Sequence, residues 1–158
     1  MIIKKINYGK QFEEDFIKSL PDYIFRLRLK DAGGWSNAEN TRFTVSNPCD
    51  FIIQNRQLNL YMAELKTHKG KSIPYSAMKQ LDKMIEYQNK YEYINCIFII
   101  NFRDLNKTFI INVLRLDLIR SDTDRKSFAY DDIKEWGVLI PQKLKRIRYK
   151  YDLEEYFE

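Results

Sequence analysis

Three charged residues in the middle of the chain, Asp50, Glu64 and Lys66, stand where a buried core would favour hydrophobic side chains. Asp50 opens the apolar run CDFIIQ, and Glu64 and Lys66 close the run LNLYMAELK. If these runs form a hairpin, a turn near Gln57 sets Asp50 opposite Glu64. Because side chains alternate along a strand, Glu64 and Lys66 share one face and Leu65 takes the other.

Paired acids beside a lysine indicate metal-dependent phosphate chemistry. Two carboxylates at contact distance repel each other unless a cation lies between them. Mg²⁺ suits that gap because it takes carboxylate and carbonyl oxygens, so the candidate ligands are Asp50, Glu64 and the carbonyl of Leu65. Such a metal activates water and polarises a phosphate oxygen, and Lys66 would orient the water or stabilise the pentavalent phosphate. The alternative is a strand cap and an exposed ion pair, because short acid and lysine spacings also arise by chance.

The composition indicates a single folded domain spanning residues 1–158, with 44% hydrophobic and 31% charged residues. Two cysteines, Cys49 and Cys96, and one histidine, His68, are too few for a zinc site or a disulfide framework. The net charge of +5 fits a polyanionic partner without specifying one. With no signal peptide and no membrane-spanning run, we expect a cytoplasmic protein with no membrane partner.

The order of elements predicts an α/β fold in which helices flank a mixed sheet. Phe12, Phe16 and Leu20 form one stripe of a helix within 9–22, and a second helical pattern covers 76–91. The apolar run 94–102 has the length of a central strand buried on both faces. The other predicted elements are strands at 23–29 and 107–113, short helices at 114–120 and 130–137, and a mobile loop or short stalk at 31–45.

The motifs GKQFEEDF, CDF, ELK, SIPYS and KQLDKM occur in that order between residues 7 and 115. This arrangement resembles the RecU-type Holliday junction resolvases of the PD-(D/E)XK nuclease superfamily, and a compact phage or prophage member would fit the length. The resemblance implies a restriction-endonuclease-like core that acts as a homodimer, depends on Mg²⁺ or on Mn²⁺ in its place, and cuts four-way DNA junctions symmetrically.

The same resemblance assigns roles to individual residues. It pairs Gly9 with Glu13 and matches Asp50, Glu64 with Lys66, and Gln80 to the family's site. Lys66, Glu13 and Gln80 are thus the candidate catalytic residues; for Glu13 a surface acid, and for Gln80 a residue at the edge of the core, are the alternatives. Two features depart from the pattern: Cys49 separates Pro48 from Asp50, and the stalk before Asp50 is short.

Basic residues near the predicted site and near the C-terminus are candidate DNA contacts. The C-terminal segment 142–151 interleaves cations with Leu, Ile and Tyr and could lie along a DNA backbone as an edge strand. Lysines and arginines that protect an exposed sheet edge are the alternative. The candidate contacts are Arg42, Lys69, Lys71, Lys143, Lys145, Arg146 and Arg148.

The sequence therefore predicts a Mg²⁺-dependent endodeoxyribonuclease that resolves Holliday junctions by paired phosphodiester hydrolysis in DNA recombination and repair. Two alternatives stay open. One is a nuclease of the same superfamily that acts on duplex or flap DNA. The other is a recombination accessory protein that binds junctions without cutting them, against which the intact Asp50, Glu64 and Lys66 set argues.

Overall fold

The computed structural model describes residues 4–29 and 47–158. The predicted loop or stalk at 31–45, with Arg42, lies outside the described residues. None of the described helices is long and apolar enough to cross a membrane.

A six-stranded mixed sheet forms the centre of the fold, with the strand order β1-β2-β3-β5-β6-β8. β3 and β5 run parallel, and the other neighbouring strands are antiparallel. The predicted central strand is β5, whose seven residues from Cys96 to Phe102 are all buried. The strands are β1 Phe25–Arg28, β2 Phe51–Gln54, β3 Leu60–His68, β5 Ile94–Phe102, β6 Lys107–Asn112 and β8 Val138–Ile140.

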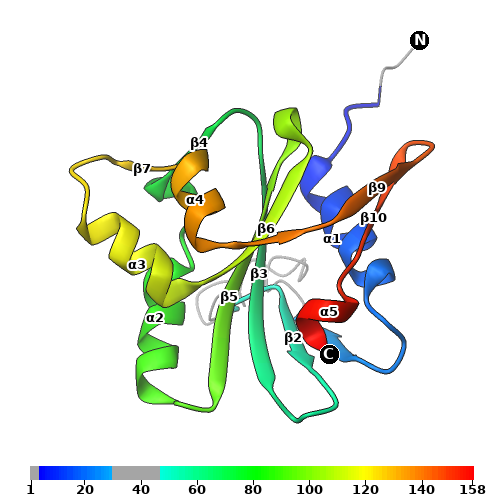
Figure 1. Ribbon diagram of the computed structural model, residues 1–158, viewed down its shortest axis with the longest axis horizontal. Coiled ribbons are helices and arrows are strands. Elements are labelled where there is room, and N and C mark those ends of the chain that lie inside the picture. Colours follow the sequence, from blue (N-terminus) through cyan, green and yellow to red (C-terminus); the bar gives the residue numbers. More distant parts are fainter. Residues whose placement is uncertain (1–3, 30–46) are drawn as a thin grey trace, which may run out of the picture.

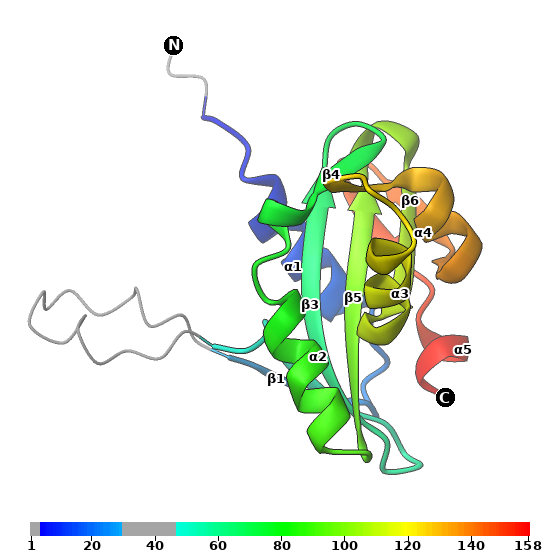
Figure 2. The ribbon, with the colours of Figure 1, turned by 90° about the vertical axis from the view of Figure 1, so that its left-hand side faces the viewer.

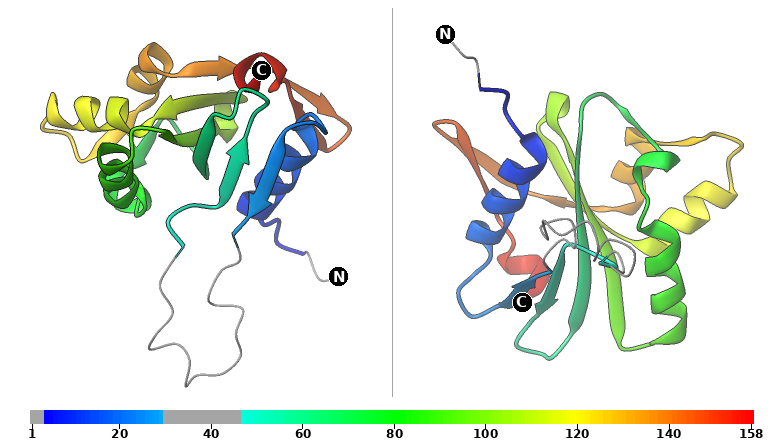
Figure 3. Two further views of the ribbon diagram at one scale, coloured as in Figure 1. Left: turned by 90° about the horizontal axis from the view of Figure 1, so that it is seen from below. Right: turned by 180° about the vertical axis from the view of Figure 1, so that it is seen from behind.

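Helices cover both faces of this sheet, which confirms the predicted α/β class. α2 Leu81–Lys90, α3 Val113–Ser121 and α4 Tyr130–Trp136 lie on one side, and α1 Tyr8–Ser19 and α5 Glu154–Phe157 lie on the other (Figure 1, Figure 3). Asn7 is the N-cap of α1, and its side chain accepts a hydrogen bond from the Lys10 amide at 3.1 Å.

Alternation along β3 separates two hydrophobic cores. Ala63 and Leu65 pack into the core under α1, with Phe12 and Phe16. Met62 packs into the core under α2 and α3. Because Glu64 and Lys66 follow Met62 at intervals of two, they share one face of the strand, as the sequence predicts, and this face lies toward α2. Figure 2 shows β3 and β5 side by side with α2 and α3 in front of them.

Several elements differ from those expected from the sequence. The second helix begins at Leu81 because the 3₁₀ turn η3 Tyr75–Ala77 and a further turn precede it. A small two-stranded sheet joins β4 Ser72–Pro74 to β7 Ser127–Ala129. The sequence suggests an edge strand for the basic segment 142–151. The structure instead shows a separate hairpin of β9 Gln142–Lys145 and β10 Arg148–Tyr151. Its turn suits a hairpin because Arg146 has a φ of 62°.

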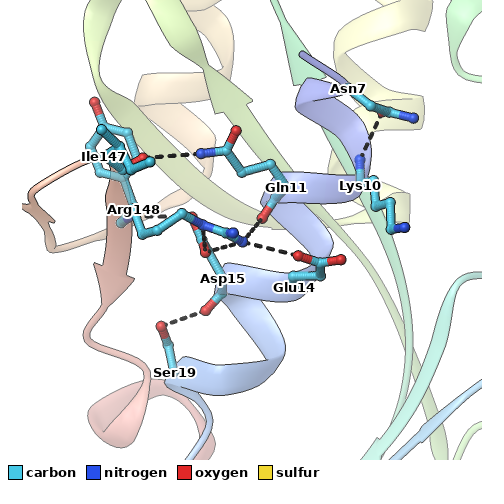
Figure 4. A network of polar contacts seen from close by, with 9 residues as sticks. Asn7, Lys10, Gln11, Glu14, Asp15, Ser19, Ile147 and Arg148 are labelled. Atoms are coloured by element: carbon cyan, nitrogen blue, oxygen red, sulfur yellow. Dashed lines mark hydrogen bonds and ion pairs between the residues drawn. The ribbon is translucent and has the colours of Figure 1, made fainter. Parts of the chain in front are cut away.

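A buried carboxylate fastens this hairpin to α1. Asp15, only 4% exposed, accepts hydrogen bonds from Arg148 Nε at 2.7 Å and from the Tyr149 amide at 3.1 Å. Arg148 also donates to Glu14 at 3.1 Å, and Gln11 donates to the Ile147 carbonyl at 3.0 Å (Figure 4). The Arg148 guanidinium, a predicted DNA contact, is therefore engaged in holding the hairpin.

Replacing Asp15 by Ala is expected to lower the free energy of unfolding by about 2–4 kcal/mol, because it removes the buried acceptor of both the Arg148 guanidinium and the Tyr149 amide. Urea unfolding followed by circular dichroism would measure the loss. Glu14→Ala is the matched control, since this carboxylate pairs with the same arginine but is 43% exposed, and should cost less than about 1 kcal/mol. Equal losses in the two variants would contradict the anchoring role of Asp15.

Candidate active site

The ladder between β2 and β3 brings Asp50 and Glu64 together. Phe51 pairs with Ala63, so Asp50 lies one step further, opposite Glu64. The Asp50 amide donates to the Ala63 carbonyl at 3.1 Å, and the Leu65 amide donates to Asp50 Oδ2 at 2.9 Å. The predicted hairpin register is confirmed.

The Glu64 side chain is buried although it is ionisable. It is 7% exposed, and its pKa is raised from 4.5 to about 8, chiefly by burial. The negative charge of Asp50 contributes to this rise in pKa, Lys66 opposes it, and Glu13 makes a smaller contribution to the rise. These mutual effects show that the two acids, the lysine and the helical glutamate share one electrostatic environment. A protein without a task for these charges would gain stability by replacing them.

The backbone of Leu65 turns its polar groups toward Asp50. In a strand, the amide and carbonyl of one residue point to the same side, and the Leu65 amide bonds to Asp50 Oδ2. The Leu65 carbonyl therefore points to the side of β3 on which Asp50 lies, as a shared cation would require. Among the described residues, no three His, Cys, Asp or Glu side chains are grouped to hold a metal. Two carboxylates, one carbonyl and waters instead suit a hard cation such as Mg²⁺.

Glu13 approaches the site from α1. Its Oε2 accepts from Arg28 Nη2 at 2.7 Å and from Nε at 3.1 Å, and its side chain is 21% exposed. Gly9, one turn earlier, lines the same cavity of about 600 Å³, to which Lys10 and Arg28 also contribute. The sequence reasoning missed Arg28 as a neighbour of the site. The signal was the alternation of Arg26 and Arg28 in β1, which places both side chains on the face toward α1.

The two cysteines do not supply reactive thiolates. Burial raises the pKa of Cys49 to about 12, with a contribution from the Glu64 charge, and burial raises that of Cys96 to about 11. Both therefore stay protonated at neutral pH. The chemistry available at this end of the hairpin comes from carboxylates, a carbonyl and the Lys66 amine.

The remaining predicted catalytic and DNA-binding residues lie in three other parts of the fold. Gln80 is the residue before α2, half-buried, and its carbonyl accepts from the Met84 amide at 3.0 Å. Lys69 and Lys71 are exposed in the turn that follows β3. Exposed Lys143, Lys145 and Arg146 belong to the β9–β10 hairpin. Their contact with DNA stays a prediction, as do the catalytic roles of Glu13, Gln80 and Lys66.

Comparison with solved structures identifies a protein of the same fold. The chain is similar to the structure of Archaeoglobus fulgidus Hjc, a Holliday junction resolvase from an archaeal hyperthermophile, with a TM-score of 0.56. The similarity covers 83% of this chain and 95% of that chain, at 15% sequence identity. No family model matches the sequence, and no curated protein matches it.

The two chains share a fold, and at this identity the likeness extends to the fold alone. It confirms the expectation of a mixed sheet flanked by helices over most of the chain. The roles of individual residues depend on the geometry around Asp50, Glu64 and Lys66 rather than on the comparison.

Proposed function

We propose that this protein is a metal-dependent structure-selective DNA endonuclease of the PD-(D/E)XK superfamily that resolves four-way junctions. One observation carries the proposal. The buried Glu64 lies opposite Asp50 at the end of a hairpin, with Lys66 on the same strand face. The ordered motifs of a RecU-type resolvase and the fold shared with a junction resolvase support the substrate. RecU-type membership and a phage origin belong to the same proposal.

Asp50, Glu64 and the Leu65 carbonyl would hold the cation, Mg²⁺ or Mn²⁺. Bound there, it would lower the pKa of a water and polarise a phosphate oxygen. The raised pKa of Glu64 indicates that these residues suit a cation. Ionising Glu64 is unfavourable beside Asp50 alone, and a bound cation would make it favourable.

The side chains around these ligands would do the remaining work. Lys66 extends from the same strand face as Glu64 and would offset the charge that develops on the phosphate. Glu13 would orient the attacking water from α1, and Arg28 holds its carboxylate in place at 2.7 Å. Gln80 would support the site from the start of α2.

The proposed resolvase acts as a homodimer, because paired symmetric incision needs two active sites and each chain supplies one set of Asp50, Glu64 and Lys66. Multi-angle light scattering with and without a four-way junction tests this. We expect the mass of two chains on one junction. A single chain under both conditions would remove the dimer from the proposal.

A panel of labelled DNAs separates the proposed substrate from its rival. Cleavage of a four-way junction, a flap and a duplex of matched sequence would be compared in Mg²⁺. We expect cutting of the junction at rates at least ten times those for the duplex. Equal cutting of all three DNAs would support a nuclease, but one without a preference for junctions. Binding without cutting under any divalent metal would favour the accessory protein.

A further inference from the structure

A second hollow lies on the other side of α1 from the cavity that Gly9 and Glu13 line. We call it the hairpin cleft. It lies between the start of α1, the turn after β5 and the tip of the β9–β10 hairpin, and has a volume of about 800 Å³. Pockets of this size hold small molecules or single nucleotides, whereas a double helix does not fit inside one.

Four cations line the hairpin cleft, Lys69, Arg103, Arg146 and Arg148, and Arg148 is paired with Asp15 and Glu14. None of the other three cations forms an ion pair with any residue that the structure describes. Two acids also line the cleft, but both are engaged. Asp15 accepts from Arg148 and Tyr149, and Asp104 accepts from the Gly70 amide at 3.0 Å. The four cations outnumber the two acids, so the cleft offers net positive charge to an anionic ligand.

The same cleft exposes apolar and aromatic surface. Ile147 is 80% exposed and Leu144 is 59% exposed at the hairpin tip, and Tyr8 contributes a ring that is 48% exposed. The Arg103 guanidinium lies 4.4 Å from the centre of the Tyr8 ring. Cations interleaved with flat apolar surface are what single-stranded nucleic acid binds, through its phosphates and through its bases. A duplex offers phosphates but keeps its bases stacked inside.

The walls of the cleft are fixed before any ligand arrives. Asp15 and Gln11 hold the hairpin against α1 through Arg148 and the Ile147 carbonyl (Figure 4). Tyr149 Oη donates to Asn106 Oδ1 at 2.7 Å, which joins the hairpin to the turn after β5. These bonds stabilise a hairpin whose tip leaves its own apolar side chains in solvent. A rigid wall of this kind lowers the entropic cost of binding.

The hairpin cleft also lies within reach of the candidate active site. Lys69 follows Lys66 by three residues, a span of about 10 Å along extended chain. That is roughly three base steps of a DNA strand at 3.4 Å each. The first turns of α1 separate the hairpin cleft from the cavity beside Arg28, since Gly9 and Glu13 line that cavity and Tyr8 and Gln11 line the cleft.

We propose that the hairpin cleft binds unpaired nucleotides of the DNA, with phosphates on Lys69, Arg103 and Arg146 and a base against Tyr8 and Ile147. The inference rests on the proposed function only in taking DNA as the ligand. It deepens that function by giving the enzyme a means to prefer DNA with unstacked bases near a branch.

The test measures binding rather than cleavage, so it is independent of the nuclease activity. Fluorescence anisotropy of a labelled oligothymidylate and of a labelled hairpin duplex would be recorded in EDTA for the full chain. The double variant Tyr8→Ala, Ile147→Ser removes the stacking surface and is expected to weaken binding of the single strand about 10- to 100-fold. Duplex binding should stay within about twofold of the original.

Leu118→Ser is the matched control, because this side chain on α3 is 61% exposed and lies outside the cleft. It should leave both affinities unchanged. Unchanged single-strand binding in the double variant, or an equal loss for duplex, would overturn the proposal. Displacement of the oligothymidylate by a polyglutamate peptide, equally in both proteins, would also overturn it and assign the cleft to an acidic protein. If the protein cleaves no DNA but the double variant still loses single-strand binding selectively, the proposed role of the cleft holds and the nuclease proposal fails.

Discussion

Replacing Asp50 by Asn is expected to reduce DNA cleavage at least about 10³-fold, which corresponds to about 4 kcal/mol of lost transition-state stabilisation. The amide keeps the size of the side chain and an oxygen that can accept from the Leu65 amide, so the hairpin should stay folded. It removes the negative charge that a cation would bind. Single-turnover cleavage of a labelled junction would measure the rate, and anisotropy in Ca²⁺ would measure binding.

Asp82→Asn is the matched control, because Asp82 is 80% exposed on α2 and pairs with Arg120 rather than with the site. Its rate should stay within about twofold of the original. Unchanged cleavage in Asp50→Asn would remove Asp50 from the mechanism. Loss of folding in that variant, seen by circular dichroism, would make Asp50 a structural acceptor for the Leu65 amide instead.

Glu64 is expected to make the metal-free protein less stable as the pH rises. Its pKa is about 8 in the folded protein and close to 4.5 when unfolded, so the folded state holds the extra proton between these values. The stabilisation is present in full below pH 4.5 and is lost as the pH rises to 8. At the pKa difference of about 3.5 units the loss reaches up to about 5 kcal/mol. Urea unfolding from pH 5 to 9 in EDTA would measure it.

Glu64→Gln is the control for this linkage, since its amide does not titrate and its stability should depend much less on pH over the same range. A divalent cation should restore the stability of the original protein, and more at pH 8 than at pH 6, because it competes with the proton for the carboxylate. Parallel pH profiles for the two proteins would contradict a raised Glu64 pKa. Absence of any Mg²⁺ or Ca²⁺ effect at pH 8 would argue against a metal at this site.

The parts that sequence predicted correctly are those set by short-range patterns. The run 94–102 matches β5 residue for residue, since an unbroken Ile and Phe stretch of that length suits a strand buried on both faces. The pairing of Asp50 with Glu64 followed from the turn near Gln57 and from the period of two along a strand. The position of Asp50 opposite Glu64 could therefore be predicted from the sequence.

The parts that sequence missed depend on contacts between distant segments. The segment 142–151 forms its own hairpin because Asp15 and Gln11, more than 130 residues earlier, supply its partners. Arg148 resembles a DNA contact in a basic run, but its guanidinium is held by buried Asp15. For Arg28 the sequence indicates only that it alternates with apolar residues along a strand. Its ion pair with Glu13 arises because β1 packs beside α1 in the folded protein. Local patterns carry no signal for such pairs.

The most direct test of the central claim is to map the cuts in a four-way junction whose strands are labelled one at a time, in Mg²⁺ and in EDTA. The proposal predicts paired nicks at symmetric positions on opposite strands near the branch point, absent in EDTA and absent from a duplex of matched sequence. Junction DNA that is bound tightly and left intact under Mg²⁺ and Mn²⁺ would contradict it. The buried pair of Asp50 and Glu64 would then need another explanation.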